Sequence, residues 1–219
     1  MIKKSILFLC MVSQIISFGL SAAAEIRNEP PEDLLPAANK ILKNRFQSES
    51  WKKEAFPPYF HPDDDFMDFK LGQPITYYKI HLDKLYNLED KSKFKETLEF
   101  LGWLIPIYLG DENKPRTVFC IKKGNGHKWK YASMGGYTTA IDQARNIWPI
   151  QEGYDHAKAI VSRMKVPLII LEKNTKIQFY YPGENGERIF GISKNNEGYY
   201  PLFSLEDLIR VASNNPQYR

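Results

Sequence analysis

From Gly72 onward the chain is a succession of short segments rich in β-branched and aromatic residues, each bounded by Gly, Asn, Asp or Pro. Segments of this composition fit a half-buried pleated surface, and the turn residues between them limit each strand to a few residues. The pattern predicts strands at residues 73–81, 103–109, 116–123, 128–134, 166–172, 176–182, 188–194 and 198–203. The chain is therefore expected to fold around one or more sheets.

Helical spacing of apolar residues separates these runs of strands. The positions are Phe94, Leu98 and Leu101; Ala140, Ile141, Ala144 and Ile147; Ala157, Ile160, Val161 and Met164; and Leu205, Leu208, Ile209 and Ala212. Runs of strands between isolated helices predict an α+β protein with mostly antiparallel pairing and packed helices. One domain is expected over 71–219, and a repeated order of strands and turns predicts two related half-units, 71–149 and 150–213.

The glycine-rich stretch GNGHKWKYASMGG, residues 124–136, raises the alternative of a phosphate-binding loop. A Walker-type loop needs G-x-x-x-x-G-K-[ST] leading into a helix, because backbone amides and the helix N-terminus supply the anion site. Here the glycines lead into a strand-like segment, and no Lys-Ser or Lys-Thr pair follows. We therefore expect Gly124 and Gly126 to form a hairpin turn.

Two helix starts carry the pattern of a capping box, in which a hydroxyl residue is followed three positions later by an acidic one. Asp142 stands three residues after Thr139, although Thr138 is an alternative cap. Asp207 stands three residues after Ser204. Each pair predicts a helix that begins directly after its cap.

The first 24 residues have the pattern of a secretory signal: Lys3 and Lys4 precede an apolar run that ends in small residues. The apolar run is short for a membrane span, so export to the periplasm or the cell exterior as a soluble protein is expected. Residues 25–70 form a proline-rich extension. Within it, apolar residues at helical spacing between Leu34 and Phe46 predict one amphipathic helix that packs on the main domain.

Charge and cysteine usage exclude some classes of protein. Removal of residues 1–24 lowers the formal net charge from +4 to +2, which gives no electrostatic footprint for nucleic acid. The same cut leaves Cys120 as the one thiol, so no internal disulfide can form and packing must hold the fold. We expect no cofactor.

Two groups of residues are candidates for catalysis or metal binding. Cys120 with His127 and Asp142 would form a thiol nucleophile, but a strand position does not lower a thiol pKa, and a buried apolar role is favoured. His61 with Asp63 and Asp65 offers hard ligands, but consecutive aspartates lack the spacing of a calcium loop. A solvated acidic turn is favoured there, and no metal or catalytic residue is assigned.

Aromatic residues are frequent, and tyrosines occur in adjacent pairs. Neighbours in a strand face opposite sides of the sheet, so each pair can send one ring to the core and one outward. The rings expected to bind a partner are Trp129, Tyr131, Tyr181 and Tyr200. They would suit a protein or, as an alternative, a carbohydrate.

Two resemblances add to this interpretation. The segments LGQPITYYKI, WLIPIYLGDENKPRTVFCIKKGNGHKWKYASMGG and YTTAIDQARN, within residues 71–150, resemble a group of secreted bacterial proteins without an assigned chemistry. Residues 166–212, with VPLIILEKN and PLFSLEDLIRVA, are similar to repeats of the chloroplast intermembrane-space import component (Tic-type) and its periplasmic relatives. The first resemblance implies export and architecture, and the second implies a chaperone-like role.

The function expected from the sequence is non-catalytic binding of a protein or peptide partner, by addition of the peptide to an unpaired sheet edge. Neither a nucleic-acid partner nor a membrane span is expected. An exported enzyme built on Cys120, His127 and Asp142 and a carbohydrate-binding module are the alternatives.

Overall fold

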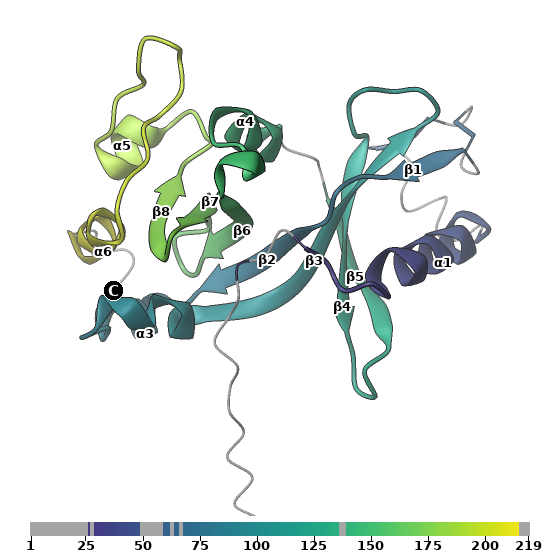
Figure 1. Ribbon diagram of the computed structural model, residues 1–219, viewed down its shortest axis with the longest axis horizontal. Coiled ribbons are helices and arrows are strands. Elements are labelled where there is room, and N and C mark those ends of the chain that lie inside the picture. The colour runs from purple at the N-terminus through teal and green to yellow at the C-terminus, as the bar shows by residue number, and fades with distance from the viewer. Residues whose placement is uncertain are drawn as a thin grey trace, which may run out of the picture.

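A computed structural model describes residues 26, 29–48, 59–61, 64–65, 68–135 and 139–214, and the predicted signal segment 1–24 lies outside them. The chain forms an α+β fold around one eight-stranded sheet of order β5-β4-β3-β2-β6-β7-β8, with β1 also paired to β3 (Figure 1). The strands are β1 (Phe69–Leu71), β2 (Ile75–Ile80), β3 (Leu98–Leu109), β4 (Thr117–Lys123), β5 (Trp129–Gly135), β6 (Asp155–Val161), β7 (Val166–Lys173) and β8 (Lys176–Tyr180).

The pairing within the sheet is antiparallel except between β2 and β6, which run parallel. The predicted fold class and mostly antiparallel pairing are therefore confirmed. The β2–β6 pair joins strands from the two predicted half-units into one continuous sheet. Whether those half-units are related stays a prediction.

Strand β3 is bent by a bulge. Tyr77 of β2 pairs with Gly102 and Tyr78 pairs with Phe100, so Leu101 is an extra residue on β3. Gly102 has a φ of +145°, a conformation that other residues rarely adopt. A bulge of this kind bends its strand and increases the local twist. The two ends of β3 consequently run in different directions, as Figure 1 shows.

Two apolar cores lie on opposite faces of the sheet where β3 and β4 pass between them. Val118 and Cys120 belong to a larger core that continues under the C-terminal half of the chain. Phe119 and Ile121 belong to a smaller core that α1 (Leu34–Phe46) closes. The alternation follows from the period of two in a strand and explains why β4 reads as a continuous apolar run.

Helix α1 is the predicted helix of the N-terminal extension. Its buried residues recur every four positions, at Leu34, Ala38, Leu42 and Phe46, and they pack on β3 and β4 within the smaller core. Pro36 lies in the first turn, where its missing N–H has no helical acceptor. The predicted packing of this helix on the main domain is confirmed.

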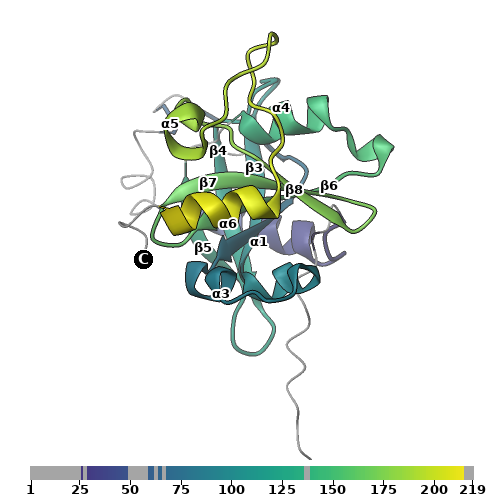
Figure 2. The ribbon, with the colours of Figure 1, turned by 90° about the vertical axis from the view of Figure 1, so that its left-hand side faces the viewer.

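The remaining helices lie over the C-terminal part of the sheet. They are α3 (Leu82–Tyr86), η1 (Lys91–Thr97), α4 (Ala140–Ile147), η2 (Ile150–Glu152), α5 (Gly186–Phe190) and α6 (Leu205–Asn214). Figure 2 shows α6 in front of β7 and directly above α3, and the phenol of Tyr86 donates a hydrogen bond to Ala212 O at 2.8 Å between these two helices. The helix–helix contact ties the corner between β2 and β3 to the end of the chain.

Some local predictions are confirmed. Residues 124–128 form the hairpin tip, in which His127 N–H bonds to Gly124 O at 3.1 Å and Gly126 has a φ of +81°. Ser204 and Asp207 exchange hydrogen bonds as a capping box at the start of α6. By contrast, Thr139 makes no side-chain capping bond to α4, so the box predicted there is wrong, and Thr138 lies outside the described residues.

Two helix predictions are wrong. Residues 98–101 begin β3 after the short 3₁₀ helix η1, and residues 155–161 form β6, flanked by β2 and β7. In β6 the buried Ala157, Ala159 and Val161 follow a period of two, which pairing on both edges enforces against the helix propensity of alanine. Two strand predictions also fail, because 188–194 contains the end of α5 and 198–203 contributes only the isolated bridge of Phe203.

No helix within the described ranges is long and apolar enough to span a bilayer.

Candidate functional site

The structure places Trp129 and Tyr131 against the N-terminal extension. Trp129 Nε1 donates a hydrogen bond to Asp33 Oδ2 at 2.8 Å, and the Arg45 guanidinium stacks 3.5 Å from the centre of the Tyr131 ring. Both rings are half-buried beside the smaller core. They therefore secure the two ends of α1 to β5, and this contact uses much of the ring surface expected to face a partner.

Tyr181 and Tyr200 are core residues, with 5% and 3% of their surface exposed. The Tyr200 hydroxyl donates to Glu184 O at 2.8 Å and accepts from Gly186 N–H at 3.1 Å. The two rings lie in the larger core, whereas Trp129 and Tyr131 border the smaller one. The four predicted residues are thus not brought together, and burial removes Tyr181 and Tyr200 from any surface platform.

The candidate thiol triad is also dispersed. Cys120 is 3% exposed, and its burial raises the pKa of the thiol to about 11. His127 is exposed at the hairpin tip, and the helix that carries Asp142, α4, lies at the opposite end of the hairpin in both views (Figures 1 and 2). A buried protonated thiol fits the apolar role that the sequence favours.

The acidic turn has a structural use. His61 N–H donates to Asp64 Oδ2 at 2.6 Å, and the Arg116 guanidinium lies 3.4 Å from Asp64 Oδ1. Asp63 lies outside the described residues. Over the described ranges, no three His, Cys, Asp or Glu side chains are placed to share a metal ion.

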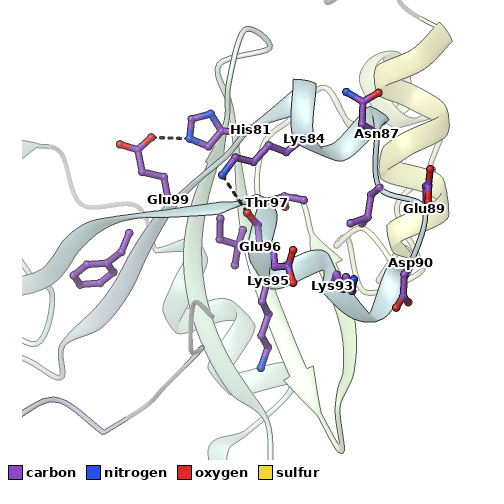
Figure 3. A pocket seen from close by; sticks show the side chains of 13 residues that line it. His81, Lys84, Asn87, Glu89, Asp90, Lys93, Lys95, Glu96, Thr97 and Glu99 are labelled. Carbon is purple, nitrogen blue, oxygen red and sulfur yellow. Dashed lines mark hydrogen bonds and ion pairs between the residues drawn. The ribbon is translucent and has the colours of Figure 1, made fainter. Parts of the chain in front are cut away.

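A different region has the geometry of a binding site. A surface hollow of about 1060 Å³ lies where α3, η1 and the start of β3 meet, and Figure 3 shows the side chains that line it. His81 and Glu99 border it from one face of β3, and Leu98 and Phe100 border it from the other. Residues of both faces line the hollow, so it follows the edge of the strand.

That edge of β3 is unpaired. Strand β4 pairs with β3 only from Trp103 to Ile107, and in the described part of the chain no other strand covers the same side of residues 98–101. We call these four residues the open edge. The bulge at Leu101 explains it, because the bend carries the first part of β3 away from β4.

The hydrogen-bond pattern shows which backbone groups point outward from the open edge. His81 N–H bonds to Thr97 O at 3.0 Å, and Lys79 is paired with Glu99. Bonded and non-bonded pairs alternate in an antiparallel ladder, so Glu99 bonds to β2 while Leu98 and Phe100 direct their backbone groups away from it. The Leu98 N–H already donates a hydrogen bond to Lys95 O at the end of η1. The outward groups that can bond a ligand are therefore the N–H and C=O of Phe100 and the C=O of Leu98.

Phe100 gives the open edge an apolar surface. The residue is 46% exposed, and among the described residues Leu35, at 36%, is the only other large apolar residue that is exposed. The ring contacts Tyr78 edge-on at a centroid distance of 5.6 Å and Trp103 at 6.4 Å. These contacts hold the ring in place at the surface, which reduces the entropy lost when a ligand packs on it.

Glu99 provides the polar surface on the other face. Its Oε2 accepts from Lys79 Nζ at 3.2 Å and lies 2.7 Å from His81 Nε2, as Figure 3 shows for His81. These hydrogen bonds, that of Lys79 first, lower the pKa of the Glu99 carboxyl, so it stays ionised at neutral pH. The side chain is 48% exposed and remains accessible from the hollow.

Local hydrogen bonds shape the wall of the hollow around η1. Asp90 caps this helix by accepting from the Ser92 hydroxyl at 2.7 Å and from Ser92 N–H at 2.9 Å, and these bonds, that of the hydroxyl first, lower the pKa of its carboxyl. Thr97 Oγ1 donates to Phe94 O at 2.7 Å, and Lys84 Nζ donates to Glu96 O at 3.3 Å. These bonds hold η1 together and tie it to α3, so the wall that precedes the open edge is fixed in place.

Sequence reasoning missed Phe100, Glu99 and His81. The helical pattern assigned to Phe94, Leu98 and Leu101 hid the strand that carries the first two. The alternation of Leu98, Glu99 and Phe100 was the available signal, together with Gly102 as a mark of a bulge.

Comparison of the chain with protein-family models, with curated proteins and with solved structures gives no match. The resemblances drawn from the sequence therefore stay predictions.

Proposed function

We propose that this protein binds an extended peptide segment of a partner by strand addition at the open edge of β3, without chemical change to the partner. The observation that carries the proposal is the coincidence of the 1060 Å³ hollow with the unpaired edge, residues 98–101. An exposed edge with free donors and acceptors is a template for a further strand. Main-chain bonds then supply affinity and alternate side chains supply specificity.

Three features of the hollow support a peptide over a small molecule. Its outward hydrogen-bonding groups belong to the backbone and are spaced along a strand. Its side chains alternate between the apolar Phe100 and the ionised Glu99. Its volume, about 1060 Å³, is large for a compact ligand but suits a groove that holds several residues.

The expected setting of this activity is outside the cytoplasm, as the pattern of residues 1–24 predicts. A partner exposed there as an extended segment would be an unfolded or disordered part of another exported protein. Such a role agrees with the chaperone-like function that the weaker resemblance implies.

The test compares two substitutions at one position. Peptides selected from a displayed library of extended segments are titrated against Phe100→Ala, which removes the ring, and Phe100→Pro, which also removes the outward N–H. We expect Phe100→Ala to weaken binding about tenfold and Phe100→Pro to weaken it by about another fivefold, since one net hydrogen bond is worth about 1 kcal/mol.

Leu35→Ala is the matched control, because Leu35 is also exposed but lies on α1. It should leave the affinity unchanged. Peptides that bind all three variants as they bind the unmodified chain would place the site elsewhere and refute the proposal.

A further inference from the structure

We infer that the preferred partner presents a three-residue pattern, in which a hydrogen-bond donor side chain stands between two bulky apolar residues. This inference rests on the proposed function and specifies the peptide that the open edge selects. The pattern reads the same in both chain directions, so it holds for parallel and for antiparallel addition.

The length of the pattern follows from what closes the two ends of the open edge. At one end, η1 ends at Thr97 and its backbone takes the Leu98 N–H. At the other end, β3 joins β4 at Trp103. At about 3.3 Å per residue, the four residues of the open edge, 98–101, span roughly 13 Å. Only three or four residues of a partner can pair there, so the edge recognises a short motif and leaves no room for a long strand.

The outer positions of the motif are apolar because of the residues they face. Residues directly opposite one another on neighbouring strands share a face of the sheet. The partner residues opposite Phe100 and Leu98 therefore lie on the face of these two side chains, where Phe100 already contacts Tyr78 and Trp103. Branched or aromatic side chains would extend this apolar surface and cover the exposed part of the Phe100 ring.

The middle position faces Glu99. In the described part of the chain, both contacts of this carboxylate, to Lys79 and to His81, are made by Oε2. Oε1 of the same half-exposed carboxylate is therefore accessible to a donor from the partner. A lysine, arginine or amide side chain satisfies it, whereas an acidic side chain would place like charges directly opposite each other.

A second copy of this chain fits the open edge poorly. When Phe100 of one copy faces Leu98 of the other in an antiparallel pair, Glu99 faces Glu99 across the twofold axis. Two ionised carboxylates directly opposite each other oppose this pairing. The acidic residue thus disfavours self-association at the same position where it favours a donor from a different partner.

The test uses two blocked peptides that differ only in the middle residue, acetyl-Thr-Ile-Lys-Ile-Thr-amide and acetyl-Thr-Ile-Glu-Ile-Thr-amide. Titration calorimetry against the full chain should give about fivefold tighter binding of the lysine peptide, the size expected for one exposed charge pair set against one like-charge pair. A third peptide with the alternation inverted, acetyl-Thr-Lys-Ile-Lys-Thr-amide, should bind at least tenfold more weakly than the first.

Substitution of the acidic residue separates this inference from the proposed function. Glu99→Gln should reduce the lysine-to-glutamate preference to about twofold or less while both peptides still bind. Asp111→Asn removes the same charge at an exposed residue in the turn after β3 and should keep the preference at about fivefold.

Each outcome decides one of the two statements. Equal affinity for the lysine and glutamate peptides, or a preference that Glu99→Gln leaves intact, overturns the inference but keeps peptide binding at the edge. Failure of all three peptides to bind overturns both statements. A dimer in sedimentation that Phe100→Pro dissociates would assign the edge to a second copy and would also overturn the inference.

Discussion

The two ends of strand β3 lie in different surroundings. From Trp103 to Ile107 the strand is paired with β4, and β2 and β1 pair with parts of its other side, so residues 103–109 are mostly buried between two cores. From Leu98 to Leu101 it is paired on one side only and borders a hollow. A single bulge at Leu101 and Gly102 separates these two parts of the strand. We call the residues after the bulge, together with the β4 residues paired to them, the closed part of the sheet.

In the proposed function, the capacity to bind a peptide comes from the strand pairing that β3 lacks at residues 98–101. A closed sheet would satisfy every backbone group of β3, whereas the outward backbone groups of Phe100 and the C=O of Leu98 have no strand partner before the bulge. The closed part holds the fold, so the open edge can remain accessible at little cost to stability.

The largest effect is expected in the closed part. Phe119 of β4 pairs with Ile105 of β3 and is fully buried in the smaller core. Phe119→Ala should lower the free energy of unfolding by about 3 to 5 kcal/mol, because it removes apolar contacts and leaves a cavity. Urea unfolding measures the loss. A decrease below about 1 kcal/mol would show that the closed part does not carry the fold.

Ionisation of Cys120 should weaken the closed part at alkaline pH. Burial raises the thiol pKa from 9.0 to about 11, so the neutral thiol contributes fully below pH 9, and its contribution falls as pH rises from about 9 to 11. The loss should reach about 2 to 3 kcal/mol. Urea unfolding at several pH values measures this loss. In Cys120→Ala the free energy of unfolding should not show this decrease between pH 9 and 11. The same decrease of the free energy of unfolding with pH in both proteins would contradict the burial of the thiol.

Gly102 tests the boundary between the two parts. A Cβ atom at this position would lie 2.7 Å from Ile121 O and 2.8 Å from Cys120 Sγ, and the φ of +145° disfavours any side chain. Gly102→Ala should destabilise the fold by roughly 1 to 3 kcal/mol and weaken peptide binding, because the bend must shift. Thermal unfolding and peptide titration measure the two effects.

Gly126→Ala is the control for backbone conformation, since Gly126 also has a positive φ, yet a Cβ atom added there would meet no other atom within 4 Å. Equal destabilisation by both substitutions would mean that the contacts at the bulge are unimportant.

The smallest effect on stability is expected at the open edge. Phe100→Ala should change the free energy of unfolding by less than about 1 kcal/mol, because nearly half of the residue is exposed. The same substitution should weaken peptide binding about tenfold. Calorimetric unfolding and peptide titration on one sample compare the two quantities. If Phe100→Ala lost more stability than Phe119→Ala, the open edge and not the closed part would hold the fold.

The sequence predicted several turn-bounded strands better than the open edge. Predicted strands that have turn residues at both ends, such as 116–123 and 166–172, were confirmed, as was the hairpin tip at 124–128. Local composition determines these elements, since turn residues and β-branched side chains act over a few positions.

The open edge depended on contacts that a local pattern does not contain. The spacing of Leu98 and Leu101 fits a helix as well as a bulged strand, and only pairing with β2 decides between them. The parallel β2–β6 pair likewise depends on residues far apart in the chain. Buried Tyr181 and Tyr200 were indistinguishable by composition from surface rings, because burial of an aromatic depends on what covers it.

Amide hydrogen exchange at Glu99 and Phe100 would report directly on strand addition at the open edge. In the free protein the Phe100 N–H, which points away from β2, should exchange rapidly, while the Glu99 N–H should be protected by its bond to β2. Saturation with acetyl-Thr-Ile-Lys-Ile-Thr-amide should slow exchange at Phe100 at least tenfold and leave Glu99 unchanged. A Phe100 amide that is already protected in the free protein, or that exchanges equally fast with the peptide bound, would contradict strand addition at the open edge.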